Sequence, residues 1–314
     1  MRRIPVIVFL MFLSAVNIMA QMDAQIGQYW FMPGTFNPGA LAINNKLNVA
    51  ALNRMQWSGI DNAPNSFFIT AESPFKFMKK EHKAGFILVN DKAGLFSNTT
   101  FGLQYAYQLK MNEHKLSLGI RLGAASHGFN GSKIEIPDTP DHNSSDASLP
   151  KEDVSEMAFD AGFGVYYNYK RLSIGFSALH LSAPEIELGD KSYIKLERTY
   201  YLTGGYNIEL RNPLYELQTS FLVKTDMIFW QEEFDAILCY NKMFFGGFGY
   251  RFGDAVKVNV GVEIKGVRLN YTYDISTSAI ARASSGSHEL SASYNIKLDL
   301  SGKSKNKHKS IRIL

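Results

Sequence analysis

Cysteine is almost missing from this chain of 314 residues, in which Cys239 is the only thiol. One cysteine cannot build an internal disulfide framework. Cys239 also lies far from the N-terminus, whereas the acylated cysteine of a lipoprotein directly follows its leader. Internal disulfides and a lipid anchor on cysteine are therefore excluded.

Long apolar runs are also missing beyond the first residues, and the mean hydropathy is only −0.13. No later stretch approaches the roughly 18 apolar residues of a spanning helix, which excludes an α-helical membrane protein. The chain also has little excess charge of either sign: its net charge is only +4, and cations and anions are intermixed until the C-terminus. A nucleic-acid partner needs a concentrated basic face and is therefore disfavoured.

The first feature that is present is a secretory leader. Two arginines near the start are followed by an apolar run from about Ile4 to Val16 and by Ala20 at a suitable cleavage site. Residues 1–20 are predicted to be a signal peptide, and a cut after Ala24 is the alternative. An uncleaved anchor is disfavoured because the run is shorter than the roughly 20 residues that span a bilayer.

From Lys46 onward the dominant pattern has a period of two, in segments of about ten residues. In one such segment Val256 and Val258 share one face, while Lys257 and Asn259 share the other. This alternation predicts strands with one apolar and one polar face, and helical spacing does not fit it. Fourteen strands are predicted, at roughly 46–54, 66–74, 82–90, 100–111, 114–125, 157–169, 171–180, 196–210, 213–225, 232–241, 243–252, 255–264, 266–276 and 287–300.

The connections between these strands indicate a membrane. Links after even-numbered strands are mostly tight, and links after odd-numbered strands, such as 90–100, are mostly long. The link from Lys76 to Glu81 and the link at Gly253-Asp254 break this rule. Short turns on the periplasmic side and long external loops are typical of outer-membrane barrels. We predict an all-β fold, a transmembrane antiparallel up-and-down β-barrel of about 14 strands. The alternation by itself would also fit a soluble β-sandwich, which is the alternative.

The chain is predicted to consist of four parts, of which the leader is the first. Residues 21–45 are expected to form a periplasmic N-terminal segment, residues 46–300 the barrel with a long external loop at 126–156, and residues 301–314 a basic C-terminal tail. The acidic stretch 130–153 offers hard oxygen ligands for calcium, but its spacing matches no EF-hand. A solvated external loop is the favoured interpretation.

The predicted inner face carries charges of both signs. This mixture gives no ion preference and favours pairing of the charges with one another or with a plug. Inward glycines such as Gly119 and Gly164 indicate curvature of the wall first and an open lumen second. The inward charged residues are Arg121, Lys257, Glu263, Arg268 and Asp274.

Catalytic motifs are not found. The seven histidines form no HExxH pair, and the chain has no GxSxG elbow and no phosphate-binding glycine loop. His127 near Ser126 and Asp160 is a candidate base, but one sequence does not establish nucleophile–base geometry. We expect a protein that is not an enzyme and that needs no cofactor or metal.

Six short elements occur in a fixed order along the mature chain. They are Asn37-Pro38-Gly39, Arg54-Met55-Gln56-Trp57, Ala63-Pro64, Asn90-Asp91-Lys92-Ala93-Gly94, Tyr105-Ala106-Tyr107 and Gly286-Ser287-His288-Glu289. Together they resemble the PorP/SprF family of Bacteroidota, which are membrane components of the type IX secretion system and of the gliding machinery. This chain departs from the family pattern in two ways: the first element has glycine where alanine is usual, and the basic tail has no terminal aromatic residue.

The resemblance implies a non-enzymatic component of protein secretion and gliding motility in the outer membrane. Its partners would be the lipid bilayer, the periplasmic ring subunits of the secretion system, and cargo proteins that are secreted or anchored at the surface. A passive diffusion porin is the alternative function.

The family elements also have expected physical roles. Asn37-Pro38-Gly39 has turn chemistry and is expected to redirect the N-terminal segment into the first strand. Arg54 and Gln56 are expected to point inward, and Trp57 to anchor at the membrane interface. The alternative is that these residues hold the following loop, 58–65.

Overall fold

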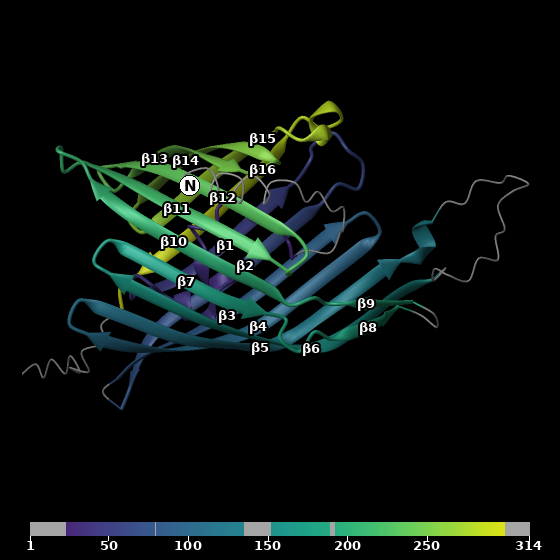
Figure 1. Cartoon of the computed structure of the whole chain (residues 1–314), viewed down its shortest axis with the longest axis horizontal. Coiled ribbons are helices and arrows are strands. Elements are labelled where there is room, and N and C mark those ends of the chain that lie inside the picture. The colour runs from purple at the N-terminus through teal and green to yellow at the C-terminus, as the bar shows by residue number, and fades with distance from the viewer. Residues whose placement is uncertain (1–22, 79, 135–151, 189–191, 299–314) are drawn as a thin grey trace, which may run out of the picture.

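The computed structural model describes residues 23–78, 80–134, 152–188 and 192–298, and over these the chain forms a closed barrel of fourteen strands (Figure 1). Two further strands, β8 (Glu185–Leu188) and β9 (Ser192–Lys195), form a separate hairpin beyond the barrel. The barrel strands are β1 (Leu47–Met55), β2 (Asn65–Phe77), β3 (Lys80–Ala93), β4 (Phe96–Met111), β5 (His114–Asn130), β6 (Asp153–Tyr169), β7 (Leu172–Leu179), β10 (Thr199–Glu209), β11 (Tyr215–Thr225), β12 (Trp230–Tyr240), β13 (Phe244–Arg251), β14 (Ala255–Ile264), β15 (Val267–Ser276) and β16 (Ser287–Ile296).

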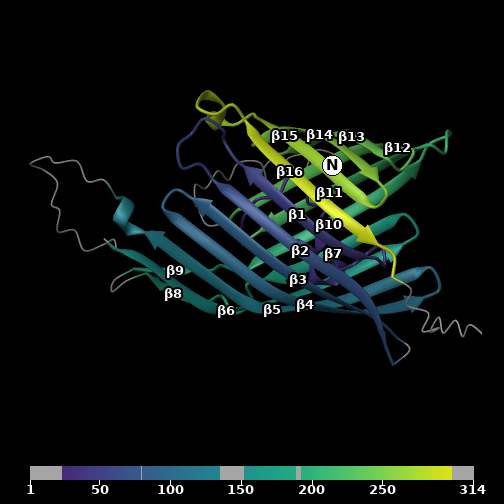
Figure 2. The same cartoon turned by 180° about the vertical axis from the view of Figure 1, so that it is seen from behind.

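Each barrel strand pairs antiparallel with its neighbours in the chain, and β7 pairs with β10 across the β8–β9 hairpin. The barrel closes where β1 pairs with β16, in a register that sets Leu47 opposite Ile296 and Met55 opposite His288 (Figure 2). The predicted up-and-down barrel of fourteen strands is confirmed.

The two faces of the wall have the opposite polarity to those of a soluble protein. On β4 and β5, Leu103 and Leu122 are 60% and 51% exposed on the outside, whereas Gln104 and Arg121 are 5% and 4% exposed in the lumen. An apolar exterior around a polar interior suits a barrel that lies in lipid. No helix in the described residues is long and apolar enough to cross a membrane.

The connections define two rims. The short-turn rim holds the turns β2–β3, β4–β5, β6–β7, β10–β11, β12–β13 and β14–β15, together with the start of β1 and the end of β16. The long-loop rim holds the other connections and lies on the right in Figure 1.

Three predicted connections differ from the structure because strands run further than the alternation suggests. The link 90–100 is not a long loop: β3 continues to Ala93 and β4 starts at Phe96. The link from Lys76 to Glu81 is tight, because β2 ends at Phe77 and β3 starts at Lys80. Strands β5 and β6 also enter the predicted loop 126–156, of which residues 135–151 lie outside the described residues.

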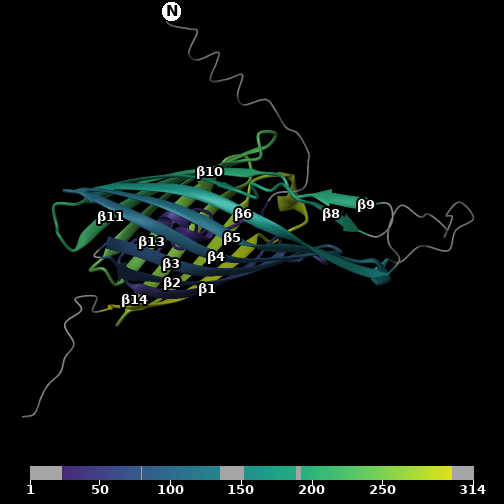
Figure 3. The ribbon, with the colours of Figure 1, turned by 90° about the horizontal axis from the view of Figure 1, so that it is seen from below.

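The N-terminal segment lies inside the barrel (Figure 3), not in the predicted periplasmic position. Residues 23–45, here called the plug, contain the short 3-10 turns η1 (Pro33–Thr35) and η2 (Pro38–Ala40). The physical reason is burial: the apolar side chains of the strands face outward, so the lumen is where the plug's own apolar residues leave water. The leader and the C-terminal tail lie outside the described residues.

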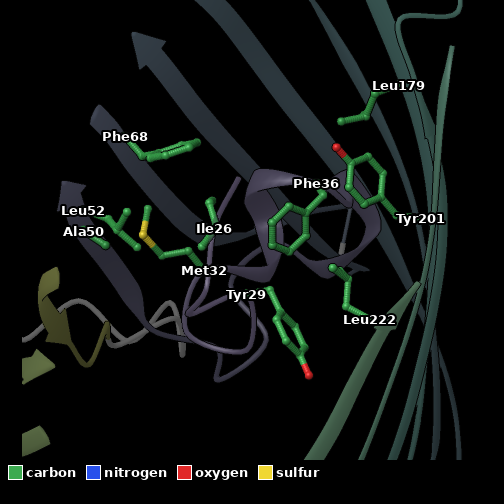
Figure 4. Packing of buried hydrophobic residues seen from close by; sticks show 10 residues of the cluster. All are labelled: Ile26, Tyr29, Met32, Phe36, Ala50, Leu52, Phe68, Leu179, Tyr201 and Leu222. Atoms are coloured by element: carbon green, nitrogen blue, oxygen red, sulfur yellow. The ribbon is translucent and has the colours of Figure 1, made fainter. Parts of the chain in front are cut away.

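The apolar core of the molecule is formed between the plug and the inner wall. Figure 4 shows Ile26, Tyr29, Met32 and Phe36 of the plug among inward side chains of the strands. The wall residues of this cluster are Ala50, Leu52, Phe68, Leu179, Tyr201 and Leu222.

Candidate functional site at the luminal plug

A network of buried charges lines one side of the lumen, on β1 and on β12 to β16. Arg54 contacts Asp274 at 2.7 Å and Glu289 at 3.1 Å. Arg251 also contacts Asp274, at 3.0 Å. The whole network consists of three cations, Arg54, Arg251 and Lys257, and four carboxylates, Glu233, Asp235, Asp274 and Glu289, all of them nearly fully buried.

The plug backbone completes this network. The backbone N–H groups of Gly27 and Gln28 both donate to the carboxylate of Glu289, at 2.7 Å. The ammonium group of Lys257 donates to the carbonyl of Gly27 at 2.9 Å. Because Glu289 shares the Arg54 guanidinium with Asp274, the two N–H donors add to the stabilisation of its negative charge.

Arg54 and Glu289 occupy a particular place in the barrel, since they face each other across the seam between β1 and β16. The approach of the plug to this pair is close. A Cβ at Gly27 would lie 3.3 Å from both the Arg54 guanidinium and the Glu289 carboxylate. Glycine is therefore the residue that allows the backbone to reach the seam.

The Asn37 element fastens the plug to the opposite wall. The amide of Asn37 donates to the carbonyls of Val165 and Phe176, at 3.0 and 3.3 Å, and its side-chain oxygen accepts from the N–H of Gly39 at 2.8 Å. The predicted turn chemistry is present, because Asn37 caps η2. The element docks the plug on β6 and β7, in the lumen and not in the periplasm.

Glycines of the wall leave the space that this turn occupies. A Cβ at Gly119 would lie 2.2 Å from the carbonyl carbon of Pro38, and one at Gly164 would lie 2.1 Å from the Asn37 side-chain oxygen. The sequence attributes these inward glycines first to curvature. The structure shows that at both positions they make room for the plug.

The first described residue of the plug is fastened at the long-loop rim. The carboxylate of Asp23 contacts His180 at 2.7 Å and Tyr201 at 2.5 Å, and its carbonyl accepts from Lys224 at 2.6 Å. His180 follows the end of β7, and its other ring nitrogen lies 3.1 Å from Asp160. Burial alone lowers the pKa of His180, but the two carboxylates outweigh burial and raise this pKa to about 10.

Two further inward cations contact the plug directly. The guanidinium group of Arg121 donates to the carbonyls of Gly34 and Thr35. The guanidinium of Arg268 lies over the ring of Trp30, 5.2 Å from its centre. Both kinds of predicted pairing therefore occur: some inner charges pair with one another, and others contact the plug.

The remaining family residues lie at or near the long-loop rim. Gln56 donates to Gln25 of the plug at 2.8 Å, as its predicted inward position requires. Just beyond β1, the N–H of Trp57 donates to the hydroxyl of Ser287 at 3.1 Å, and the carbonyl of Pro64 accepts from the N–H of Gln56 at 2.9 Å. These bonds support the alternative in which the element holds the next loop, and an interfacial role for Trp57 stays a prediction.

Three other family residues are also separate from the ionic network. Asn90 bonds the hydroxyl of Thr99 at 2.8 Å, and Asp91 accepts from Ser66 at 2.5 Å. Gly94 lies in the β3–β4 turn with φ of 60°, and its N–H bonds the loop residue Asn62.

His288 points to the outer face. Its ring bonds the hydroxyl of Tyr271 at 2.7 Å and packs against Tyr273. The structure thus brings Arg54, Gln56 and Glu289 to the plug, while His288 faces away from it.

A cavity of about 220 Å³ remains between the plug and the wall at the long-loop end. Its lining is partly polar and partly apolar, and includes Asp23, Phe36, Phe68, Arg121, His127 and Leu196. Among the described residues, no three His, Cys, Asp or Glu side chains lie together as a metal site would require. The candidate calcium stretch 130–153 lies mostly outside these residues.

Several residues of the site have no counterpart in the sequence-based expectations. Glu233, Asp235 and Arg251 lie on the inward register of predicted strands, so the alternation could have found them. Asp23 and Gly27 could not have been found in this way, because the plug has no periodic pattern.

One family model matches the chain, that of the type IX secretion system membrane protein PorP/SprF, over residues 18–294. This chain belongs to the PorP/SprF family. The match includes the plug and thirteen complete barrel strands, and it ends within β16. The protein is therefore an outer-membrane component of a type IX secretion system. A comparison with curated proteins finds no significant match.

Solved structures similar to this PorP/SprF protein are barrels with very different sequences. The outer-membrane protein Omp33 of Acinetobacter baumannii shares 6% identity with a TM-score of 0.47, covering 80% of this chain and 98% of its own. A FadL homologue of Pseudomonas aeruginosa shares 10% identity with a TM-score of 0.47, covering 82% and 92%. The KdgM porin shares 10% identity with a TM-score of 0.38, covering 79% and 98%.

Proposed function

We propose that this PorP/SprF protein is a non-enzymatic docking barrel. Its short-turn rim meets periplasmic ring subunits of the secretion system, and its long-loop rim faces cargo proteins during export or surface anchoring. The observation that carries this proposal is the plug, which is fastened to the wall through Asp23, Gly27 and Asn37. A barrel whose lumen is filled offers its rims, and not a wide channel, to partners.

The orientation in this proposal follows from the connections. Both the start of β1 and the end of β16 lie at the short-turn rim, where the turns are tight. In outer-membrane barrels short turns face the periplasm and long loops face outward. The short-turn rim is accordingly the side available to periplasmic subunits.

A deletion strain tests the proposal. We expect loss of the gene to reduce export of proteins with type IX sorting domains, or to remove one class of surface adhesin, and the wild-type gene to restore it. Export is measured by quantitative mass spectrometry of the culture medium and of the cell surface. Normal export together with normal surface adhesins would refute the docking function.

A further inference from the structure

The short-turn rim carries exposed cations along one continuous part of its circumference. Arg211 lies in the β10–β11 turn, Lys242 in the β12–β13 turn, Lys265 in the β14–β15 turn, and Lys297 just after β16. All four side chains are exposed. Since β10 to β16 follow one another around the barrel, these residues form a strip of roughly 30 Å, here called the basic arc.

Within the described residues, no member of the basic arc forms an ion pair. Elsewhere on this rim several charges are paired, because Lys110 contacts Glu81, Lys170 contacts Glu113 and Arg171 contacts Glu209. Other exposed cations of the rim are Lys76, Lys80 and Lys115, at the β2–β3 and β4–β5 turns. The opposite ends of the same strands carry charges of both signs, with the acids Asp226, Glu232 and Asp254 beside the exposed cations Arg198 and Arg282. Over the described residues, the basic arc is therefore a run of exposed cations without an ion-pair partner.

The lysines of the arc are placed at some cost in backbone conformation. Lys242 and Lys265 have φ of 53° and 52°, in the left-handed region that glycine and asparagine adopt more readily. The tight turns fix where these two side chains leave the backbone. Lys170 has the same conformation in the β6–β7 turn but pairs with Glu113, whereas Lys242 and Lys265 form no ion pair within the described residues.

The position of the arc relative to the outer aromatic residues favours a protein partner over lipid headgroups. Tyr240 and Phe244, which flank the β12–β13 turn, and Tyr294 near the end of β16 are exposed on the outer face. Aromatic rings of this kind mark the membrane–water interface. The tips of the turns lie beyond the rings, on the periplasmic side of the interface.

We infer that the basic arc binds an acidic face of a periplasmic subunit of the secretion machinery. The inference rests on the proposed docking function and specifies the chemistry of the partner. Complementary charge across such an interface accelerates association and makes it sensitive to salt.

A charge-reversal variant in the native cell tests the inference. The variant combines Arg211→Glu, Lys242→Glu and Lys265→Glu, and its matched control combines Lys92→Glu, Lys133→Glu and Arg282→Glu at the long-loop rim. We expect roughly tenfold lower export with the arc variant and near-normal export with the control, at equal levels of folded barrel. Normal export by the arc variant, in cells where the deletion strain fails to export, overturns the inference alone. Normal export by the deletion strain overturns the docking function first.

Binding in vitro separates protein from lipid. The wild-type barrel and the arc variant are placed in lipid nanodiscs, and purified periplasmic ring complex is the probe. We expect binding to weaken at least roughly tenfold in the variant and to decline steeply with salt in the wild type. Equal binding by both barrels overturns the inference. So does a variant whose only change is the loss of co-purifying anionic phospholipid, because the arc would then contact lipid.

Discussion

At the scale of single residues, Arg54 has the clearest energetic role. Its guanidinium is 1% exposed and contacts Asp274 and Glu289. Arg54→Ala leaves two buried carboxylates without this partner, and breaking a buried ion pair in this way costs about 3–5 kcal/mol. We expect this loss in urea unfolding of the barrel in detergent, whereas Arg282→Ala, an exposed residue, changes stability by less than about 0.5 kcal/mol. A loss smaller than about 1 kcal/mol for Arg54→Ala would contradict the central place of this residue.

His180 and Asp23 give the outer end of the plug a defined pH dependence. The pKa of His180 is raised from 6.5 to about 10, so its stabilisation is complete below pH 6.5 and is lost as the pH rises through about 10. Burial raises the pKa of Asp23, but His180 and Lys224 lower it well below 3.8. Its stabilisation is complete above pH 3.8 and is lost as the pH falls further.

Melting curves of the folded barrel check this dependence. Between about pH 7 and pH 10 we expect the wild type to lose more stability than His180→Gln, because only the wild type releases the His180 proton. Parallel curves for the two proteins would show that His180 is not held in its charged form.

The contacts of Asp23 also predict where the leader is cut. Cleavage after Ala24 would remove Asp23 and leave His180, Tyr201 and Lys224 without their shared partner. We therefore expect the mature chain to begin at Gln21. The intact mass of the protein purified from outer membranes decides between the two cuts, and a mass that starts at Gln25 would disprove the role given to Asp23.

At the scale of elements, the plug depends on wall positions that have no side chain. Gly119→Ala places a methyl group 2.2 Å from the Pro38 carbonyl carbon, so η2 must shift. We expect a loss of about 1–3 kcal/mol, as for overpacking elsewhere. Gly246→Ala is the matched control, since its nearest neighbour would lie 4.0 Å away. Equal stability of the two variants would exclude a tight fit of plug to wall.

The strands were predictable from the sequence and the plug was not, for one physical reason. A strand between lipid and lumen must alternate, as Val256 to Ile264 does, and this pattern sets its position and inward face. The plug is surrounded by wall on all sides and needs no period. Several of its hydrogen bonds to the wall are made by backbone groups, such as the N–H groups of Gly27 and Gln28, which every sequence has. The family elements predicted Arg54 and Glu289 as candidate residues, but they did not predict that these residues contact the plug.

At the scale of the whole molecule, the filled lumen distinguishes a docking barrel from a diffusion porin. We expect the purified wild-type protein to give current near the background in planar bilayers. A variant that lacks residues 27–40 should conduct clearly if it inserts in the folded state. Large, stable channels from the wild type would favour the porin alternative.

The seam between β1 and β16 has a consequence for the order of assembly. Arg54 and Glu289 come from the first and last strands of the barrel, and they become neighbours only when these strands pair. The plug runs from Asp23 near the long-loop rim to Asn45, just before β1 at the other rim, so it spans the lumen before the first strand begins. A closed cylinder would have to be threaded by this segment. Closing the wall around the plug avoids threading, and the carboxylate of Glu289 then joins plug and seam in a single step.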